Sequence, residues 1–394
     1  MIGNLLKSNT ITDEIRQSCR LVVQNSKYVK INFDAINSFV SEFSNELKGW
    51  DVHRILSPEI HYTDDPLKAI WYFFVLDSVN FCFWAEKKSE KWKVRYKDKY
   101  LDGYDALAVC IKREAENSNV FTYPYYWAKI FVGEFMRMIY PTYEDLYYVC
   151  GELRLIEERV TNLRELGENI FEKPLSDMYK NIFWKGLDER NIQGKIKEEE
   201  ADPYKLSYNQ KNNPEKILDI LVQANQDVNK FISIIIDNFR SYRDYADYQL
   251  SNGRVIKVGF YKRAQILAHD LYLLYQYYSK NKPEFIQKYP FIKYLNFKNI
   301  NKLTAFADYK LPQYLHYKGI LSYTDDLIKE IESGKLISSK DRKEVEIRAC
   351  TVIAIEEIAN RTKSYPAIVD NVIWNLAKQN PNLPKHHRTI TIYY

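Results

Sequence analysis

Apolar side chains recur every three or four residues along most of this chain, which is the spacing of a helix with one face against a core. The pattern is clear in one stretch, at Phe33, Ile36, Phe39, Val40 and Phe43. The same spacing predicts helices over residues 11–25, 34–48, 66–79, 104–117, 215–239 and 260–278, and further helices within 141–183. We therefore expect a mainly α protein.

Between residues 81 and 96, apolar and polar positions alternate instead. The apolar members are Phe81, Phe83, Trp92, Val94 and Tyr96, and residues 87–90 separate them as a turn. Alternation is typical of strands, because successive side chains of a strand point to opposite faces. The segment therefore predicts one small antiparallel β element within the helical chain.

Cap and turn residues divide the last third of the chain into helices. Asp308 stands directly before one of them, and Gly319 lies near the end of that helix. A long helix through Ile358 follows Ser338 and Asp341, which have the spacing of a capping box with Asp in place of Glu. The remaining expected elements are a helix from Thr324 to Gly334, a helix at 370–378 and an extended tail at 388–394.

The length of 394 residues suits one large domain or two smaller ones. Residues 187–215 are polar and contain an acidic triplet at 198–200. Helices resume after this stretch without a change in composition, so we expect a surface insertion and not a linker between domains. The prediction is a single domain over residues 1–394.

The charge balance argues against a protein that docks on nucleic acid. The chain has 57 basic and 52 acidic residues, a net charge of +5, and no basic stripe. Nucleic-acid binders usually neutralise phosphates with clustered Lys and Arg. The 33 Tyr residues suit a pocket for a flat polar ligand, although a biased genome composition would enrich them as well. A small anionic ligand is compatible with this balance.

The sequence predicts a cytoplasmic protein that does not enter a membrane. The most apolar stretch, residues 69–84, contains Asp77 and Asn80 and is too short to cross a bilayer. Residues 1–14 lack the long apolar core of a secretory signal. The five cysteines are widely spaced and form no CxxC, which favours reduced thiols. We expect a monomer without a stable nucleic-acid partner.

The sequence lacks several common catalytic and cofactor-binding motifs. It has no glycine-rich phosphate loop, no HExxH zinc motif and no GxSxG nucleophile elbow. His386 and His387 are adjacent, so a regular strand or helix would point them in different directions. We therefore predict no metal and no cofactor, and the chemistry is left to carboxylates and aromatic rings.

Asp308 is the first candidate for this chemistry. It follows the apolar residues Leu303 and Phe306 and stands just before a helix. One interpretation is structural, because Asp at a helix start accepts main-chain N–H bonds and stabilises the helix by about 1 kcal/mol. The other is catalytic, because a carboxylate held beside an aromatic wall can stabilise an oxocarbenium-like transition state. The two interpretations are compatible.

The second candidate is the helix face formed by Asp370, Trp374 and Asn375. A carboxylate, an indole and an amide suit a purine-like base, since the acid can accept two N–H bonds and the ring can stack. The alternative is a half-buried Trp with solvated polar neighbours. His61 also has two interpretations, because a lone His is more often a local hydrogen-bonder than a catalyst.

Two stretches place cations next to phenols, and their side chains suit a phosphate. The alternative is that these are surface charges at helix ends. Glu344 and Arg348 stand four residues apart on a helix, and we interpret that pair as structural. The candidate phosphate-binding residues are Arg243, Tyr261, Lys262 and Arg263.

The order of these segments resembles one family, the queuosine salvage proteins, which are queuosine 5'-phosphate N-glycosidases. The likeness spans about residues 12 to 394. Each short stretch is weak alone, but their order along the chain is highly specific. The stretches are LDSVNFCFW at 76–84, VRY at 94–96, GY at 103–104, SYRD at 241–244, FYKRAQ at 260–265, FADYKLPQ at 306–313, YTDD at 323–326, EVEIR at 344–348, and the ending at 387–388 and 392–394.

This resemblance implies a mainly helical fold akin to the helical DNA glycosylases. It implies hydrolysis of queuosine 5'-monophosphate to queuine and ribose 5-phosphate, with no need for a metal. The catalytic Asp of the family falls on Asp308. Its base-binding positions fall on His61, Phe306, Asp370, Trp374 and Asn375.

The chemistry of the implied substrate sets the mechanism to expect. Queuine is a 7-deazaguanine, so it lacks the N7 atom that many glycosidases protonate, and more of the catalytic burden falls on the sugar. Asp308 is expected to stabilise the oxocarbenium-like centre or to attack it before water completes the hydrolysis. Two alternatives stay open: a glycosylase for bases in DNA or tRNA, and a non-catalytic queuine-binding module.

Overall fold

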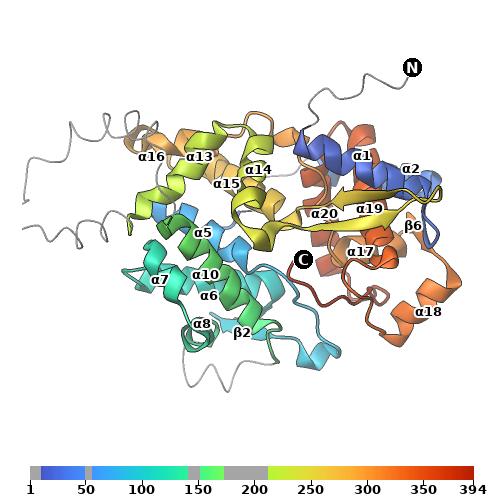
Figure 1. Ribbon diagram of the computed structural model, residues 1–394, viewed down its shortest axis with the longest axis horizontal. Helices are drawn as coiled ribbons and strands as arrows, with labels where there is room; N and C mark the ends of the chain where they lie inside the picture. The colour runs from blue at the N-terminus through green and yellow to red at the C-terminus, as the bar shows by residue number, and fades with distance from the viewer. Residues whose placement is uncertain (1–9, 49–55, 141–150, 173–211) are drawn as a thin grey trace, which may run out of the picture.

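The computed structural model describes residues 10–48, 56–140, 151–172 and 212–394, and the structural statements below concern these residues. Helices dominate them, as Figure 1 shows, so the predicted mainly α class is confirmed. Residues 1–9, much of the predicted helical stretch 141–183 and most of the predicted insertion 187–215 lie outside the described residues. No helix of the described residues is both long and apolar enough to cross a bilayer.

Most of the α-helices fall on the stretches predicted from periodicity, but α7, α8 and α16 were not predicted. In order they are α1 Ile11–Gln24, α2 Phe33–Glu42, α3 Ser44–Lys48, α5 Pro66–Ser78, α6 Gly103–Asn117, α7 Pro124–Lys129, α8 Val132–Ile139, α10 Ile156–Glu172, α13 Leu218–Ala224, α14 Val228–Asn238, α15 Lys262–Asn281, α16 Pro283–Lys288, α17 Lys310–Tyr317, α18 Asp325–Ser333, α19 Arg342–Thr362 and α20 Pro366–Gln379. Short 3₁₀ helices are η1 Lys88–Glu90, η2 Pro214–Ile217, η3 Arg240–Tyr242, η4 Pro290–Leu295 and η5 Ile300–Lys302.

Two predicted helices are interrupted, and one cap differs from its prediction. The stretch 34–48 is divided between α2 and α3 at Phe43, and the stretch 215–239 breaks where Asn225 adopts a left-handed conformation with φ 47°. Asp341, and not Ser338, caps α19, because its carboxylate accepts a hydrogen bond from the Lys343 main-chain N–H at 2.8 Å. The remaining boundaries lie within a few residues of those predicted.

The β structure differs from the single element predicted. The described residues contain three two-stranded antiparallel sheets. They pair β1 Val29–Ile31 with β6 Leu321–Tyr323, β2 Lys93–Tyr96 with β3 Lys99–Asp102, and β4 Tyr245–Gln249 with β5 Val255–Gly259. The hairpin therefore turns at residues 97–98 and not at 87–90. Phe81 is buried with Cys82 and Trp84 in a separate small apolar cluster and belongs to no strand.

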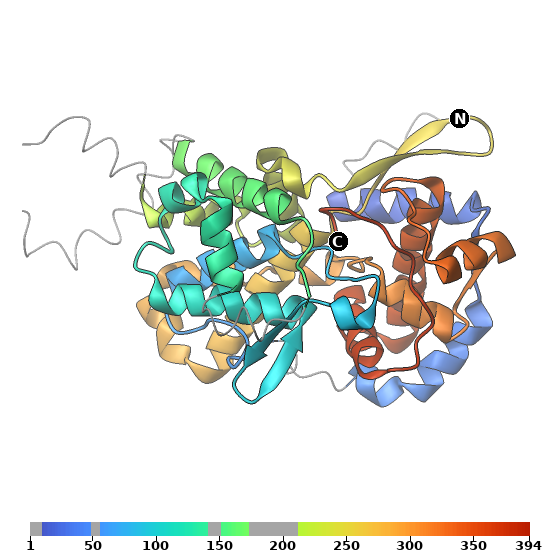
Figure 2. The same ribbon diagram turned by 90° about the horizontal axis from the view of Figure 1, so that it is seen from below.

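Two hydrophobic cores lie side by side, and Figure 2 shows the corresponding two lobes. The first core is built on α5, α6, α10, α14 and α15, and the second on α1, α17, α19, α20 and the β4–β5 hairpin. The segment before α17 runs between them: Phe306 packs in the first core, and Ala305 and Ala307 pack in the second. Asp308 therefore lies where the two cores meet.

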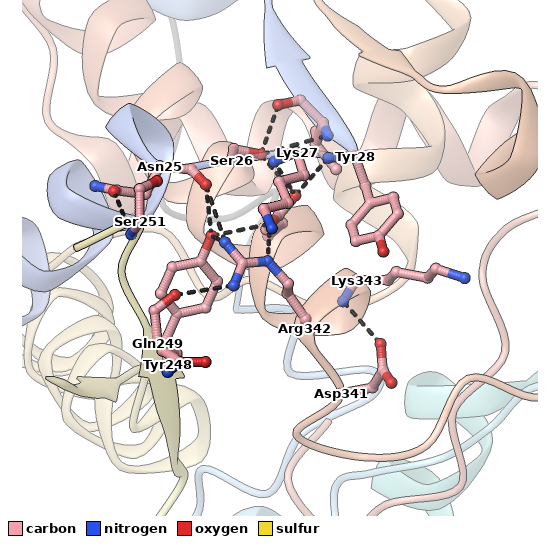
Figure 3. Close-up of polar contacts among 12 residues, drawn as sticks. Asn25, Ser26, Lys27, Tyr28, Tyr248, Gln249, Ser251, Asp341, Arg342 and Lys343 are labelled. Atoms are coloured by element: carbon pink, nitrogen blue, oxygen red, sulfur yellow. Dashed lines mark hydrogen bonds and ion pairs between the residues drawn. The ribbon is translucent and has the colours of Figure 1, made fainter. Parts of the chain in front are cut away.

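The second lobe is held together by a buried carboxylate on α19. The Glu346 side chain is fully buried, and one of its oxygens, Oε2, accepts hydrogen bonds from Ser26 Oγ at 2.7 Å and from the main-chain N–H groups of Lys27 and Tyr28 at 2.9 and 2.7 Å. Its other oxygen accepts from Tyr248 Oη and Arg342 Nε, both at 2.9 Å. Figure 3 shows Tyr248 and Arg342 beside residues 25–28, so this cluster joins α1, the β4–β5 hairpin and α19.

Candidate active site

Asp308 has one oxygen engaged in the protein and one that is not. Its Oδ1 accepts hydrogen bonds from the main-chain N–H groups of Lys310 at 2.7 Å and Leu311 at 3.1 Å, which confirms the predicted cap of α17. The side chain is 7% exposed. No described residue donates a hydrogen bond to Oδ2. The helix start therefore fixes the position of the carboxylate and leaves one oxygen for another partner.

Asp370 on α20 bonds to the main chain two residues before Asp308. Its Oδ2 accepts a hydrogen bond from the Phe306 N–H at 2.7 Å, and the side chain is buried. Burial raises the pKa of Asp370 to about 8, with the charge of Asp308 as the next cause, against the opposing effect of Lys262. At neutral pH Asp370 is therefore mainly a neutral acid, which can donate a hydrogen bond.

Lys262 is the first residue of α15 and belongs to the same group of charges. Its side chain is buried, and burial lowers the pKa of the ammonium while Asp308 and Asp370 act to raise it. Within the described residues it forms no ion pair and its ammonium makes no hydrogen bond. The structure thus brings together two carboxyl groups and one cation, from three separate parts of the sequence.

Phe306 lies two residues before Asp308, and its main-chain N–H donates to Asp370. It is buried in the first core, and its ring centroid lies 5.6 Å from that of His269 on α15. His269 is buried, its Nε2 has no hydrogen-bond partner among the described residues, and burial lowers its pKa to about 4. Sequence reasoning missed His269, although a His inside an apolar helical stretch was a usable signal.

His61 lies in a polar network that is buried in the first core. Its Nδ1 is 3.1 Å from the Ser57 carbonyl, and its Nε2 is 3.1 Å from Tyr104 Oη. Tyr104 Oη also lies 3.3 Å from Asp270 Oδ2, next along α15 from His269. Burial lowers the pKa of His61 to about 4 and raises that of Asp270 to about 7. His61 is therefore a neutral imidazole at pH 7, with Nδ1–H donating to Ser57 because a carbonyl only accepts.

Trp374 and Asn375 follow Asp370 on α20, as predicted. Trp374 packs against the second core, and the Lys378 ammonium lies 5.1 Å from its ring centroid. Asn375 donates to the Asn371 carbonyl at 2.8 Å, and its side chain is half-buried. The Asp370–Trp374 spacing of one helical turn places both on one face, with Trp374 nearer the solvent.

The remaining predicted phosphate ligands are engaged elsewhere. Arg263 is 1% exposed and donates to the carbonyls of Asp77 and Ser78 at 2.8 Å and to that of Ser241. Arg243 donates to the carbonyls of residues 236 and 237 at 2.7 and 2.8 Å. Tyr261 adopts a left-handed conformation at the start of α15 and packs against both cores. Of the four, the structure brings only Lys262 next to Asp308 and Asp370.

No group of three or more His, Cys, Asp or Glu side chains in the part of the chain that the structure describes is placed to hold a metal ion. The absence of a cofactor stays a prediction.

A family model described as Queuosine salvage protein matches residues 60–186 and 208–394. These ranges include the residues of the site from His61 to Asn375. They leave out residues 187–207, which fall inside the predicted insertion.

Curated relatives are similar to this chain over nearly its whole length. A protein from Sphaerobacter thermophilus is 30% identical over 389 residues, which is 95% of this chain and 96% of that protein. One from Mus musculus is 27% identical and covers 96% and 98% of the two chains, and one from Schizosaccharomyces pombe is 24% identical and covers 93% and 91%. All three are named queuosine 5'-phosphate N-glycosylase/hydrolase. This chain belongs to the queuosine salvage protein family.

Proposed function

We propose that this chain hydrolyses the N-glycosidic bond of queuosine 5'-phosphate and releases queuine and ribose 5-phosphate for salvage. The observation that carries the proposal is the grouping of Asp308 and Asp370 where the two cores meet. Asp308 Oδ2 has no hydrogen-bond donor among the described residues, and Asp370 is mainly a neutral acid at pH 7. Hydrolysis of a glycosidic bond needs an oxygen that faces the sugar and a hydrogen-bond donor that faces the leaving group.

On the sugar side we assign Asp308. As the bond to the base lengthens, positive charge develops on C1' and the ring oxygen, and a carboxylate fixed by two main-chain N–H groups needs no reorganisation to face it. Its Oδ2 either stabilises that charge until water attacks C1', or bonds to C1' and is released when water attacks the covalent intermediate. In both cases the water oxygen ends on C1' of the ribose, and the proton that the water loses balances the proton that the nitrogen of the departing base takes up.

On the side of the base we assign Asp370. A 7-deazaguanine has no N7 to protonate, so the negative charge that it gains must be stabilised at other atoms. A neutral carboxyl group can donate a hydrogen bond to a base oxygen or nitrogen and strengthen it as the charge develops. Phe306 and Trp374 supply aromatic surface for the base. Both ring nitrogens of His61 already contact Ser57 and Tyr104, so its part in base binding rests on the family resemblance.

The 5'-phosphate would contribute binding energy remote from the bond that breaks. We assign it to Lys262, a buried residue whose ammonium makes no hydrogen bond within the described residues. Arg243 and Arg263 are bound to main-chain carbonyls, so they are not part of this proposal. The expected monomeric state and cytoplasmic location stay predictions.

The proposed protonation of Asp370 predicts how the activity depends on pH. If the neutral acid is the active form, kcat/KM falls as the pH rises through the pKa of Asp370, about 8. Asp370→Asn should lack this alkaline limb, because its amide N–H donates at every pH. The charged groups that face Asp370 are Asp308 and Lys262, and Lys262 also titrates. An alkaline limb that is unchanged in Asp370→Asn would assign it to Lys262 and remove Asp370 as the acid.

The function is tested by incubation of the full chain with queuosine 5'-phosphate, free queuosine and queuosine-modified tRNA. Mass spectrometry then measures released queuine. We expect release from the nucleotide. Release from tRNA alone would support a nucleic-acid glycosylase, and binding of queuine without release from any substrate would support the non-catalytic module.

A further inference from the structure

We infer that Asp244 and Arg348 are positioning residues for this reaction, because their buried ion pair joins the two chain segments that carry Lys262 and Asp308. The inference rests on the proposed glycosidase function. Neither residue was assigned to the site from the sequence, where Arg348 was interpreted as the partner of Glu344. The structure confirms the Glu344–Arg348 pair at 3.4 Å, and it adds shorter contacts between Arg348 and Asp244.

Asp244 organises the start of α15. Its main-chain carbonyl accepts hydrogen bonds from the N–H groups of Phe260 at 2.9 Å and Tyr261 at 3.2 Å, and its Oδ2 accepts from the N–H of Lys262 at 3.3 Å. Three successive main-chain groups are thus held by one residue. These contacts surround Tyr261, which adopts a left-handed conformation with φ 45° directly before Lys262.

Arg348 connects that turn to the segment before α17. Its Nη1 and Nη2 donate to Asp244 Oδ1 at 2.9 Å and Oδ2 at 2.6 Å, and its Nε donates to the Ala307 carbonyl at 3.1 Å. The side chains of Arg348 and Asp244 are 3% and 4% exposed. The guanidinium also lies 4.0 Å from the ring centroid of Phe260 and 4.4 Å from that of Tyr394.

One continuous path therefore runs from Lys262 through Asp244 and Arg348 to the peptide that precedes Asp308. Only an arginine can complete it, because its planar fork donates to a carboxylate in bidentate fashion and still has Nε–H for a carbonyl. A lysine keeps the charge but has no fixed fork. Loss of the path leaves Lys262, Asp308 and Asp370 in the chain but no longer fixes their relative positions. Misplacement of a reacting group by about 1 Å is enough to cost a hundredfold in rate.

The same helix offers a matched control. Arg342 and Glu346 form another ion pair on α19, at 2.9 Å, with Glu346 fully buried. Its hydrogen bonds join residues 25–28 and Tyr248, which belong to the second lobe and not to the site (Figure 3). Substitution of Glu346 therefore measures how the loss of a buried contact on α19, away from the site, changes kcat.

The experiment compares Arg348→Lys, Asp244→Asn and Glu346→Gln in the full chain. Thermal unfolding gives Tm for each, and kcat and KM for queuosine 5'-phosphate are then measured well below the lowest Tm. We expect all three to lower Tm. Arg348→Lys and Asp244→Asn should lower kcat on the order of 10- to 100-fold with KM changed much less, whereas Glu346→Gln should keep kcat within about twofold of wild type.

The double variant Asp244→Asn/Arg348→Gln is included in case a single variant does not fold. It removes both charges of the ion pair, so neither charge is left buried alone. It should show the same loss of kcat as the single variants. Wild-type kcat in any of the folded path variants would overturn the inference, and so would an equal loss in Glu346→Gln. A wild-type chain that releases no queuine would overturn the proposed function itself, and with it the positioning roles.

Discussion

Replacement of Asp308 by Asn is expected to lower kcat/KM for queuosine 5'-phosphate on the order of a thousandfold or more, with Tm almost unchanged. The amide loses the negative charge that faces the sugar. It keeps a carbonyl oxygen, so it can still accept the hydrogen bonds that Asp308 takes from Lys310 and Leu311 at 2.7 and 3.1 Å. Asn is as good a cap as Asp. The variant therefore separates the chemical role of this residue from its structural role.

Asp308→Ala is the matched comparison, because it removes the charge and the cap together. It should lose activity to a similar degree and also lose about 1 kcal/mol of stability, measured by urea unfolding. Normal turnover in folded Asp308→Asn would remove the residue from the mechanism. Equal destabilisation by Asn and Ala would instead show that the cap depends on the charge.

The parts of this site that the sequence predicted are those that depend on local spacing. A cap needs only the next three residues, so Asp308 at a helix start was visible. The face shared by Asp370 and Trp374 follows from the helical period. The resemblance to the queuosine salvage proteins added the catalytic role of Asp308, which spacing alone left open beside the cap.

The parts that the sequence did not predict depend on contacts between distant segments. Asp244 and Arg348 are 104 positions apart, and no local pattern selects that pairing over the neighbour Glu344, which lies at 3.4 Å. The β1–β6 sheet has the same cause, since two strands of three residues are too short to show alternation. Arg263 had suitable neighbours for a phosphate, but the direction of a buried guanidinium depends on carbonyls that only the fold brings near it.

The largest loss of stability is expected for Glu346→Ala, on the order of 3–5 kcal/mol. Glu346 accepts five hydrogen bonds, two of them from the main-chain N–H groups of Lys27 and Tyr28. Alanine leaves these buried donors and the Arg342 guanidinium without their acceptor, and it also leaves a cavity in the second core. The cluster joins α1 and the β4–β5 hairpin to α19, so the loss should appear in global unfolding and not as local fraying (Figure 3).

A second carboxylate of α19 serves as the control. Glu357 lies 3.9 Å from Arg361 in the same i,i+4 arrangement, but its side chain is 35% exposed. Exposed pairs of this kind contribute about 0–1 kcal/mol, because water screens the charges and holding two long side chains costs entropy. Urea unfolding of Glu346→Ala and Glu357→Ala should therefore differ by several kcal/mol. If the two variants unfolded at the same urea concentration, the buried cluster would contribute no more to stability than an exposed ion pair. The expected loss of stability in Glu346→Ala would then be wrong.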